Sequence, residues 1–272
     1  MKALSKASSL LAGCAVAALA AFGGAGSALA DGGPGGRVVY ERPYNWSGLY
    51  FGVHAGWVWS ETNAFFPDGN PALQIVGVPG RGFGANHDAP MAGGQIGLQH
   101  QFGQIVLGVE GSYSSAYQDN PGVDLCPKQT IALFNCTARF DDVLTVGGRL
   151  GWAMGKWMPY VTGGYASARF TEQANNKSLL PQATNIVNWA QERAQGWYIG
   201  GGAEWALSHG WVVGVEYRHY DFDSHTGLAN AIVGGVAGGP IPNDNVVLNH
   251  HADTIALRVS WKLGRPEPAP LK

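Results

Sequence analysis

The chain has 272 residues, a formal net charge of −2 and only 13% charged residues, together with 41 glycines and 10 tryptophans. No basic excess is present to support binding to nucleic acid, and a mean hydropathy near zero argues against a bundle of membrane-spanning helices. The same average is compatible with a β-barrel, because alternating apolar and polar side chains cancel in it.

Residues 1–30 have the pattern of a secretory signal peptide. Lys2 and Lys6 precede an apolar stretch, and an A-x-A cleavage site ends at Ala30. The alternatives are lipidation of Cys14, which ends a lipoprotein-like LAGC sequence, and an uncleaved helical anchor. The apolar run continues well past Cys14, so cleavage after Ala30 is preferred. It leaves an exported chain with 15 basic and 19 acidic residues, a net charge of −4.

The first strand signal follows a Gly- and Pro-rich segment, residues 31–45, that we expect to be a flexible leader. Over residues 46–59, in the sequence WSGLYFGVHAGWVW, apolar and small or polar side chains alternate with a period of two, which is typical of a β-strand. One face collects the apolar members of this segment, Leu49, Phe51, Val53, Ala55 and Trp57.

Seven more segments repeat the alternation, and each has the ten or so residues that a tilted strand needs to cross an apolar band of about 25 Å. They are residues 91–102, 104–116, 140–153, 157–170, 194–207, 210–222 and 252–263. In the last of them Ile255, Leu257 and Val259 share one face, while Arg258 and Lys262 lie on the other. An apolar outer face and a polar inner face predict a membrane barrel.

The connections between these segments alternate between short and long. Three short turns separate the pairs, and the long connections cover residues 60–90, 117–139, 171–193 and 223–251. Short periplasmic turns and long extracellular loops are typical of outer-membrane barrels, and an even number of strands places both termini in the periplasm. We therefore predict an all-β fold: an eight-stranded antiparallel transmembrane β-barrel over residues 46–263, with a Pro-rich periplasmic tail at 264–272.

Aromatic residues mark both edges of the predicted apolar band, as expected at the two membrane interfaces. Near the short turns lie Phe102, Trp152, Trp157, Trp205, Trp211 and Trp261. Towards the long loops lie Trp57, Trp59, Tyr113, Phe140 and Trp197. The alternative is a secreted soluble sandwich or lipocalin-like barrel with an apolar interior, which would leave an outer surface with few charges.

The segments WSGLYFGVHAGW, DVLTVGGRLGWA and PYVTGGYA, with the signal and leader before them, resemble the small OmpA-type outer-membrane β-barrel proteins. The similarity covers about residues 46–263 and is closest to the alphaproteobacterial surface-antigen branch, which is often labelled porin-like. It implies a location in the cell outer membrane, with its lipid, lipopolysaccharide and the barrel-insertion machinery as partners. One departure is that Leu263 and a Pro-rich tail stand where such barrels end on an aromatic residue.

Charged side chains on the predicted inner face point to a closed lumen. An eight-stranded barrel is only wide enough for side chains to fill, and charges in that space need partners. We predict a salt-bridged network of Glu110, Arg149, Glu204, Glu216, Arg218, Arg258 and Lys262. A narrow ion-conducting, porin-like channel is the alternative.

Two cysteines remain in the exported chain, Cys126 and Cys136, an even number that favours a disulfide closing a small loop. No metal site or cofactor is expected. An alternative is haem or small-ligand binding through histidines at the rim of the barrel. The resemblance permits it, because some members of that family are regarded as haem-binding surface proteins. The candidates are His219, His225, His250 and His251.

A barrel-rim hydrolase is the third alternative. Asp223 and His225 have the Asp-x-His spacing of barrel proteases, but Asp141-Asp142 does not match the companion pair, and those proteases have two more strands. Our prediction is therefore a non-enzymatic barrel that contributes to envelope integrity and surface interaction, as an adhesin or antigen. Apolar side chains in the long loops could contact an extracellular ligand or a host surface.

Overall fold

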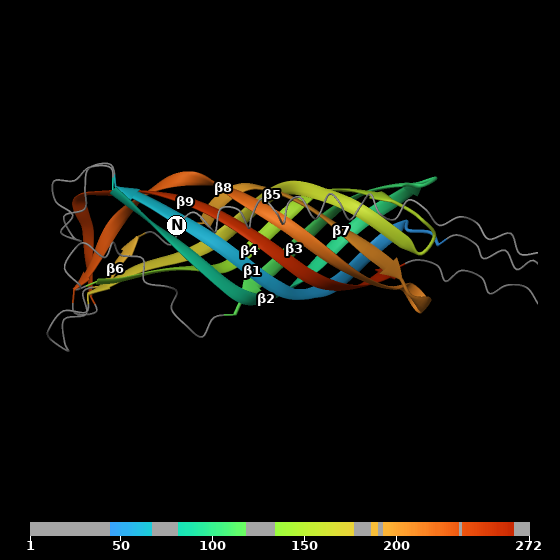
Figure 1. The fold of residues 1–272 in the computed structure, drawn as a ribbon, viewed down its shortest axis with the longest axis horizontal. Helices are drawn as coiled ribbons and strands as arrows, with labels where there is room; N and C mark the ends of the chain where they lie inside the picture. The colour runs from blue at the N-terminus through green and yellow to red at the C-terminus, as the bar shows by residue number, and fades with distance from the viewer. Residues whose placement is uncertain are drawn as a thin grey trace, which may run out of the picture. The chain divides into compact units, whose positions relative to one another are not determined.

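The computed structural model describes residues 44–66, 81–117, 134–176, 186–189, 193–233 and 236–263. The predicted signal peptide, nearly all of the leader and the tail at 264–272 lie outside these residues. The described chain is almost entirely antiparallel strand, with one 3-10 turn, η1 (Ser208–Gly210), and Figure 1 shows the strands crossing at a tilt. In this part of the chain, no helix is long and apolar enough to span a membrane.

Eight strands close into one barrel, as predicted from the sequence. The wall consists of β1 (Gly48–Phe66), β2 (Arg81–Phe102), β3 (Ile105–Ala116), β4 (Phe134–Trp152), β5 (Trp157–Asn176), β7 (Arg193–Ala206), β8 (Trp211–Val233) and β9 (Val236–Leu263). Each strand pairs with the next in this series, and β9 pairs with β1 to complete the circle. We call the end with the short turns the turn end and the opposite end the loop end.

A ninth strand, β6 (Ile186–Trp189), extends the wall at the loop end (Figure 1). It pairs with 173–175 of β5 and with 229–232 of β8. β7 lies between β5 and β8 in the membrane part of the wall, and β6 takes the same position between them nearer the loop end, where β7 has not yet begun. The backbone hydrogen bonds of β5 and β8 are therefore satisfied further from the membrane than β7 alone would allow.

The two faces of the wall have the polarity that the alternation predicts. Val53, Val109 and Leu257 on the outer face are 61–70% exposed. The aromatic rows near both ends also face outwards, including Trp57, Trp197, Trp152, Trp157, Trp205, Trp211 and Trp261. A solvent-facing wall this apolar would be unfavourable in water, whereas lipid requires it. The soluble alternative does not fit this surface.

Phe140 is one error in the predicted outer row. Its side chain is completely buried inside the barrel, where its ring packs edge-to-face against Phe170 at 5.4 Å. The cause is a β-bulge between Phe140 and Asp142, which places an extra residue in β4 and exchanges the two faces beyond that point.

Several strands are longer than predicted at the loop end. β8 has 23 residues and β9 has 28, and their backbones pair up to Val233 and Val236, so most of the predicted loop at 223–251 is a β-hairpin. Outside the apolar band the outer face does not have to be hydrophobic. The alternation that marks a strand in the membrane is therefore lost there, although the backbone pairing continues.

The outer face gives a direct test of membrane placement. Leu257→Arg places a charge in the middle of the apolar band and should lower the free energy of unfolding by about 2–4 kcal/mol. The measurement is guanidinium unfolding of the barrel in phospholipid vesicles. Asn86→Arg, at an exposed outer position of β2 near the loop end, is the control and should cost less than about 1 kcal/mol. Equal costs for the two variants would contradict the placement.

Candidate functional site: the charged lumen

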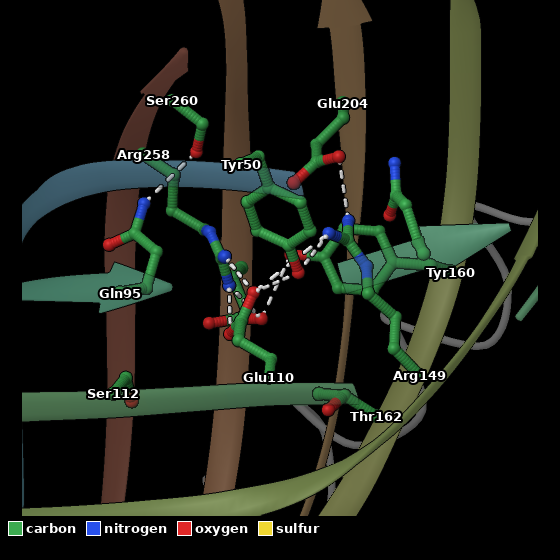
Figure 2. Close-up of polar contacts among 12 residues, drawn as sticks. Tyr50, Gln95, Glu110, Ser112, Arg149, Tyr160, Thr162, Glu204, Arg258 and Ser260 are labelled. Carbon is green, nitrogen blue, oxygen red and sulfur yellow. Dashed lines mark hydrogen bonds and ion pairs between the residues drawn. The ribbon is translucent and has the colours of Figure 1, made fainter. Parts of the chain in front are cut away.

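Glu110 on β3 is the centre of a buried ionic cluster inside the barrel (Figure 2). Its carboxylate accepts hydrogen bonds from Arg218, at 2.7 Å, and from both terminal nitrogens of Arg258, one at 3.1 Å. Arg149 lies 3.9 Å from the same carboxylate. Three guanidinium groups from three different strands therefore share one acid.

Two further acids complete the charge balance. Glu204 on β7 pairs with Arg149 at 2.7 Å. Glu216 on β8 pairs with Arg258 at 2.6 Å and with Arg218 at 2.8 Å. All of these side chains are at most 6% exposed, and three acids face three bases, so the cluster is neutral. Neutrality matters because an unpaired charge in this space would lose its hydration without compensation.

Two tyrosines hydrogen-bond to charged groups of the ionic cluster. The Tyr50 hydroxyl on β1 donates to Glu110 at 2.7 Å and accepts from Arg149 at 3.1 Å, as Figure 2 shows. The Tyr160 hydroxyl on β5 donates to Glu216 at 2.9 Å, and its ring centroid lies 3.8 Å from the Arg149 guanidinium. These contacts combine hydrogen bonding with cation–π attraction.

The cluster extends through hydroxyl and amide groups towards the remaining strands. Arg218 donates to Ser112 and Thr145, at 2.9 and 3.0 Å. On the first two strands, His54 is held by Gln95 at 2.6 Å and by Ser114 at 2.7 Å. Interior hydrogen bonds are therefore present on strands around most of the circumference.

Lys262, the seventh residue of the predicted network, lies nearer the turn end. Its ammonium group donates to the carbonyl of Asn45 and lies 4.4 Å from the ring centroid of Tyr44. These contacts link the segment before β1 to β9, the last strand. The other six predicted residues come together in the cluster that surrounds Glu110.

Two apolar layers lie on either side of the ionic cluster, and the sequence reasoning missed them. The layer at the turn end contains Trp46, Val106, Ala153, Met158, Ala206 and Val212. The layer at the loop end contains Val58, Met91, Phe140, Val143, Phe170, Tyr198, Tyr220 and Phe222, with several alanines. The inward alternate positions of the strands carry these residues, so the period-two pattern could have revealed them. The lumen is thus ionic at its centre and apolar towards both ends.

The predicted rim histidines are divided between the two faces of the wall. His250 is buried inside, stacked on Phe170 at 3.9 Å and hydrogen-bonded to Thr62. His219 and His251 are on the outer face, paired with Asp253 at 2.8 Å and with Asp221 at 3.4 Å. Adjacent residues of a strand point to opposite faces, so His250 and His251 cannot share a ligand on one face.

The other predicted sites fall mostly outside the described residues. Cys126 lies in the gap at 118–133, and of Cys136 only the backbone in β4 is described, so the predicted disulfide stays a prediction. The side chain of His225 also lies outside. Among the residues that are described, no group of three or more histidine, cysteine or acidic side chains could hold a metal ion.

Glycines provide the room that the inward tyrosines need. A Cβ atom on Gly147 would lie 2.4 Å from the Tyr198 hydroxyl and 2.4 Å from a backbone oxygen of Gly163. Tyr198 in turn lies beneath Arg218, whose guanidinium is 5.0 Å from its ring centroid. The neighbouring Gly148 faces outwards and would have no atom within 4 Å of an added Cβ.

The central position of Glu110 can be tested by Glu110→Gln. Removing its charge leaves three buried arginines with two acids, which should lower the free energy of unfolding by about 3–5 kcal/mol. Denaturant unfolding and heat-modifiable gel migration measure the effect. Glu61→Gln, an exposed outer position, is the control. Equal stability of these two variants would show that the cluster does not hold the barrel together.

The adjacent glycines allow a second, closely matched comparison. Gly147→Ala should destabilise the barrel by about 1–3 kcal/mol, because the methyl group forces Tyr198 and the strand backbone apart. Gly148→Ala should change stability by less than about 0.5 kcal/mol. Thermal unfolding in detergent distinguishes the two, and a reversed order would refute the proposed fit of Tyr198.

Comparison with known proteins agrees with this architecture. The sequence matches the family model for an outer membrane protein beta-barrel domain over residues 10–262. The 31 kDa outer-membrane immunogenic protein of Brucella melitensis biotype 1 is 27% identical over 191 residues, covering 65% of this chain and 72% of the relative. The 25 kDa outer-membrane immunogenic protein of Brucella canis is 26% identical over 189 residues, covering 69% and 70%.

Among solved structures, the outer membrane protease OmpT from Escherichia coli aligns with a TM-score of 0.46 and 10% identity, covering 82% of this chain and 99% of that one. The closed eight-stranded wall, its lipid-facing outer surface and the match over nearly the whole chain lead to one assignment. The chain belongs to the outer membrane protein beta-barrel domain family, and it is an outer-membrane protein with alphaproteobacterial immunogenic proteins among its relatives.

Proposed function

We propose that this protein is a closed, non-conducting and non-enzymatic barrel that stabilises the envelope and presents a surface for interaction outside the cell. The observation that carries the proposal is the filled lumen. A neutral ionic cluster at its centre lies between two apolar layers, so an ion would have to break the cluster and also cross both layers.

A cavity towards the turn end of the described lumen is small, which supports closure. A cavity of about 10 Å³ is bounded by Trp46, Tyr50, Arg149 and Lys262, with four further residues around it. That volume accommodates about one water molecule. Open diffusion pores are built from about sixteen to eighteen strands, roughly twice the number found in this wall.

Two of the residues considered for hydrolysis, Asp141 and Asp142, have structural partners instead. Asp142 is paired with Arg193 and Arg169, and Asp141 is paired with Arg139 at 2.8 Å. Ion pairing of this kind holds a carboxylate in place but does not assemble a base with a nucleophile. These contacts support a non-enzymatic role.

A role at the cell surface is supported by the length of the strands at the loop end. β8 and β9 continue for many residues beyond the aromatic row and form a hairpin that ends at Val233 and Val236. An ordered hairpin presents a fixed surface to a ligand or antibody at little cost in conformational entropy. Both Brucella relatives are named immunogenic proteins, and we extend that surface role to this chain.

Single-channel recording tests the closed state. The folded protein in a planar lipid bilayer should show no discrete conductance steps, because its filled cross-section offers no continuous water path. A general porin of sixteen strands, prepared in the same detergent, is the positive control. Reproducible openings that persist after further purification would overturn the proposal and favour the narrow channel.

A further inference from the structure

Among the described side chains, the outward-facing arginines lie in one sector of the wall. Arg139 on β4, Arg169 on β5 and Arg193 on β7 are partly exposed, with 35–53% of each side chain accessible. Among the side chains that the structure describes on the wall beyond the aromatic row, no other arginine or lysine faces outwards. The acids Glu61, Asp88, Asp221 and Asp253 lie on β1, β2, β8 and β9, and β8, which also carries the exposed Asp223, is the strand next to β7.

Asp142 organises two of these arginines. Its carboxylate is 9% exposed and binds both terminal nitrogens of Arg193, one at 2.9 Å, and the Nε of Arg169 at 3.7 Å. Asp142 lies on the outer face, on the same side of β4 as Leu144 and Val146. The terminal nitrogens of Arg169 are not used by this ion pair, so several N–H donors of the pair of arginines are available to another acceptor.

Among the described side chains of β4, β5 and β7 in this sector, the charges do not cancel. Asp141 pairs with Arg139, and Asp142 faces two arginines, which leaves one positive charge. A single arginine would be enough to neutralise Asp142. The second guanidinium is therefore not explained by the stability of the wall alone, and its excess charge favours an anion beside it.

The depth of these arginines is that of lipid headgroups. Arg169 and Arg193 are opposite each other on neighbouring strands, four residues beyond the outward pair Tyr165 and Trp197. Four residues rise about 13 Å along a strand, or about 10 Å along the membrane normal at the usual tilt. Since aromatic side chains lie at the membrane interface, the guanidinium groups are just above it, on the lipid side of the wall.

We propose that Arg169 and Arg193, held by Asp142, bind a phosphate group of a phosphorylated glycolipid in the outer leaflet. Arginine matches the geometry of phosphate through paired N–H donors. A lipid is the occupant because the site is on the lipid-facing wall directly above an apolar surface that can contact its acyl chains. The inference is independent of whether the lumen conducts ions.

The test compares three ligands on the folded full-length protein in detergent: bisphosphorylated lipid A, dephosphorylated lipid A and inorganic phosphate. The altered protein is Arg169→Gln/Arg193→Gln, and Lys156→Gln, an exposed lysine at a short turn of the opposite end, is the control. Binding is followed by native mass spectrometry and by the ligand-induced shift of thermal unfolding. Heat-modifiable gel migration verifies that each protein is folded.

We expect bisphosphorylated lipid A to bind the unaltered protein and the lysine control equally, and the double variant at least about tenfold more weakly. If the double variant does not fold, the single variant Arg169→Gln replaces it. This variant should fold, because Arg193 alone neutralises Asp142, and it should still bind the lipid several-fold more weakly. Unchanged affinity in the folded variant overturns the proposal, as does equal binding of dephosphorylated lipid. If inorganic phosphate binds as tightly as the lipid, the arginines form a site for anions in general and do not recognise the lipid.

Discussion

Every charge at the centre of this barrel has to be compensated by another charge beside it. The wall is closed by hydrogen bonds around its whole circumference, its outer face is apolar within the membrane, and apolar layers lie on either side of the centre of the lumen. Neither lipid nor bulk water can replace the lost hydration of an ion at the centre. Glu110 meets this constraint by contacting three arginines at once, while Glu204 and Glu216 bring the total to neutrality.

The same constraint explains the distribution of small and large residues on the inner face. Tyrosines hydrogen-bond to the acids and stack on the arginines, and such broad rings fit only where a facing strand has no side chain. Gly147 provides this space for Tyr198, and Gly202 provides it for Tyr160, whose hydroxyl lies 2.8 Å from the position of an added Cβ. The abundance of glycine is thus partly a requirement of the packed interior.

Much of this arrangement could be predicted from the sequence, because alternation assigns each strand residue to a face. It correctly placed the outer apolar residues, and it placed six of the seven suggested lumen residues where they meet. It failed at Phe140, since a one-residue bulge leaves no mark in the pattern. Strand ends beyond the membrane were also missed, because no apolar face is needed there. The separation of His250 from His251 could have been predicted, since adjacent strand residues face opposite sides.

The ionic cluster joins the two ends of the folded segment. Tyr50 belongs to the first strand and Arg258 to the last, and both contact Glu110. An incomplete sheet that lacks β9 would therefore hold Glu110 and Glu216 without one of their cations while the sheet enters lipid. Charge compensation becomes complete only when the final strand docks on the first. The interior thus favours all-or-none assembly, in which partly built intermediates are electrostatically penalised and the finished cylinder opens slowly.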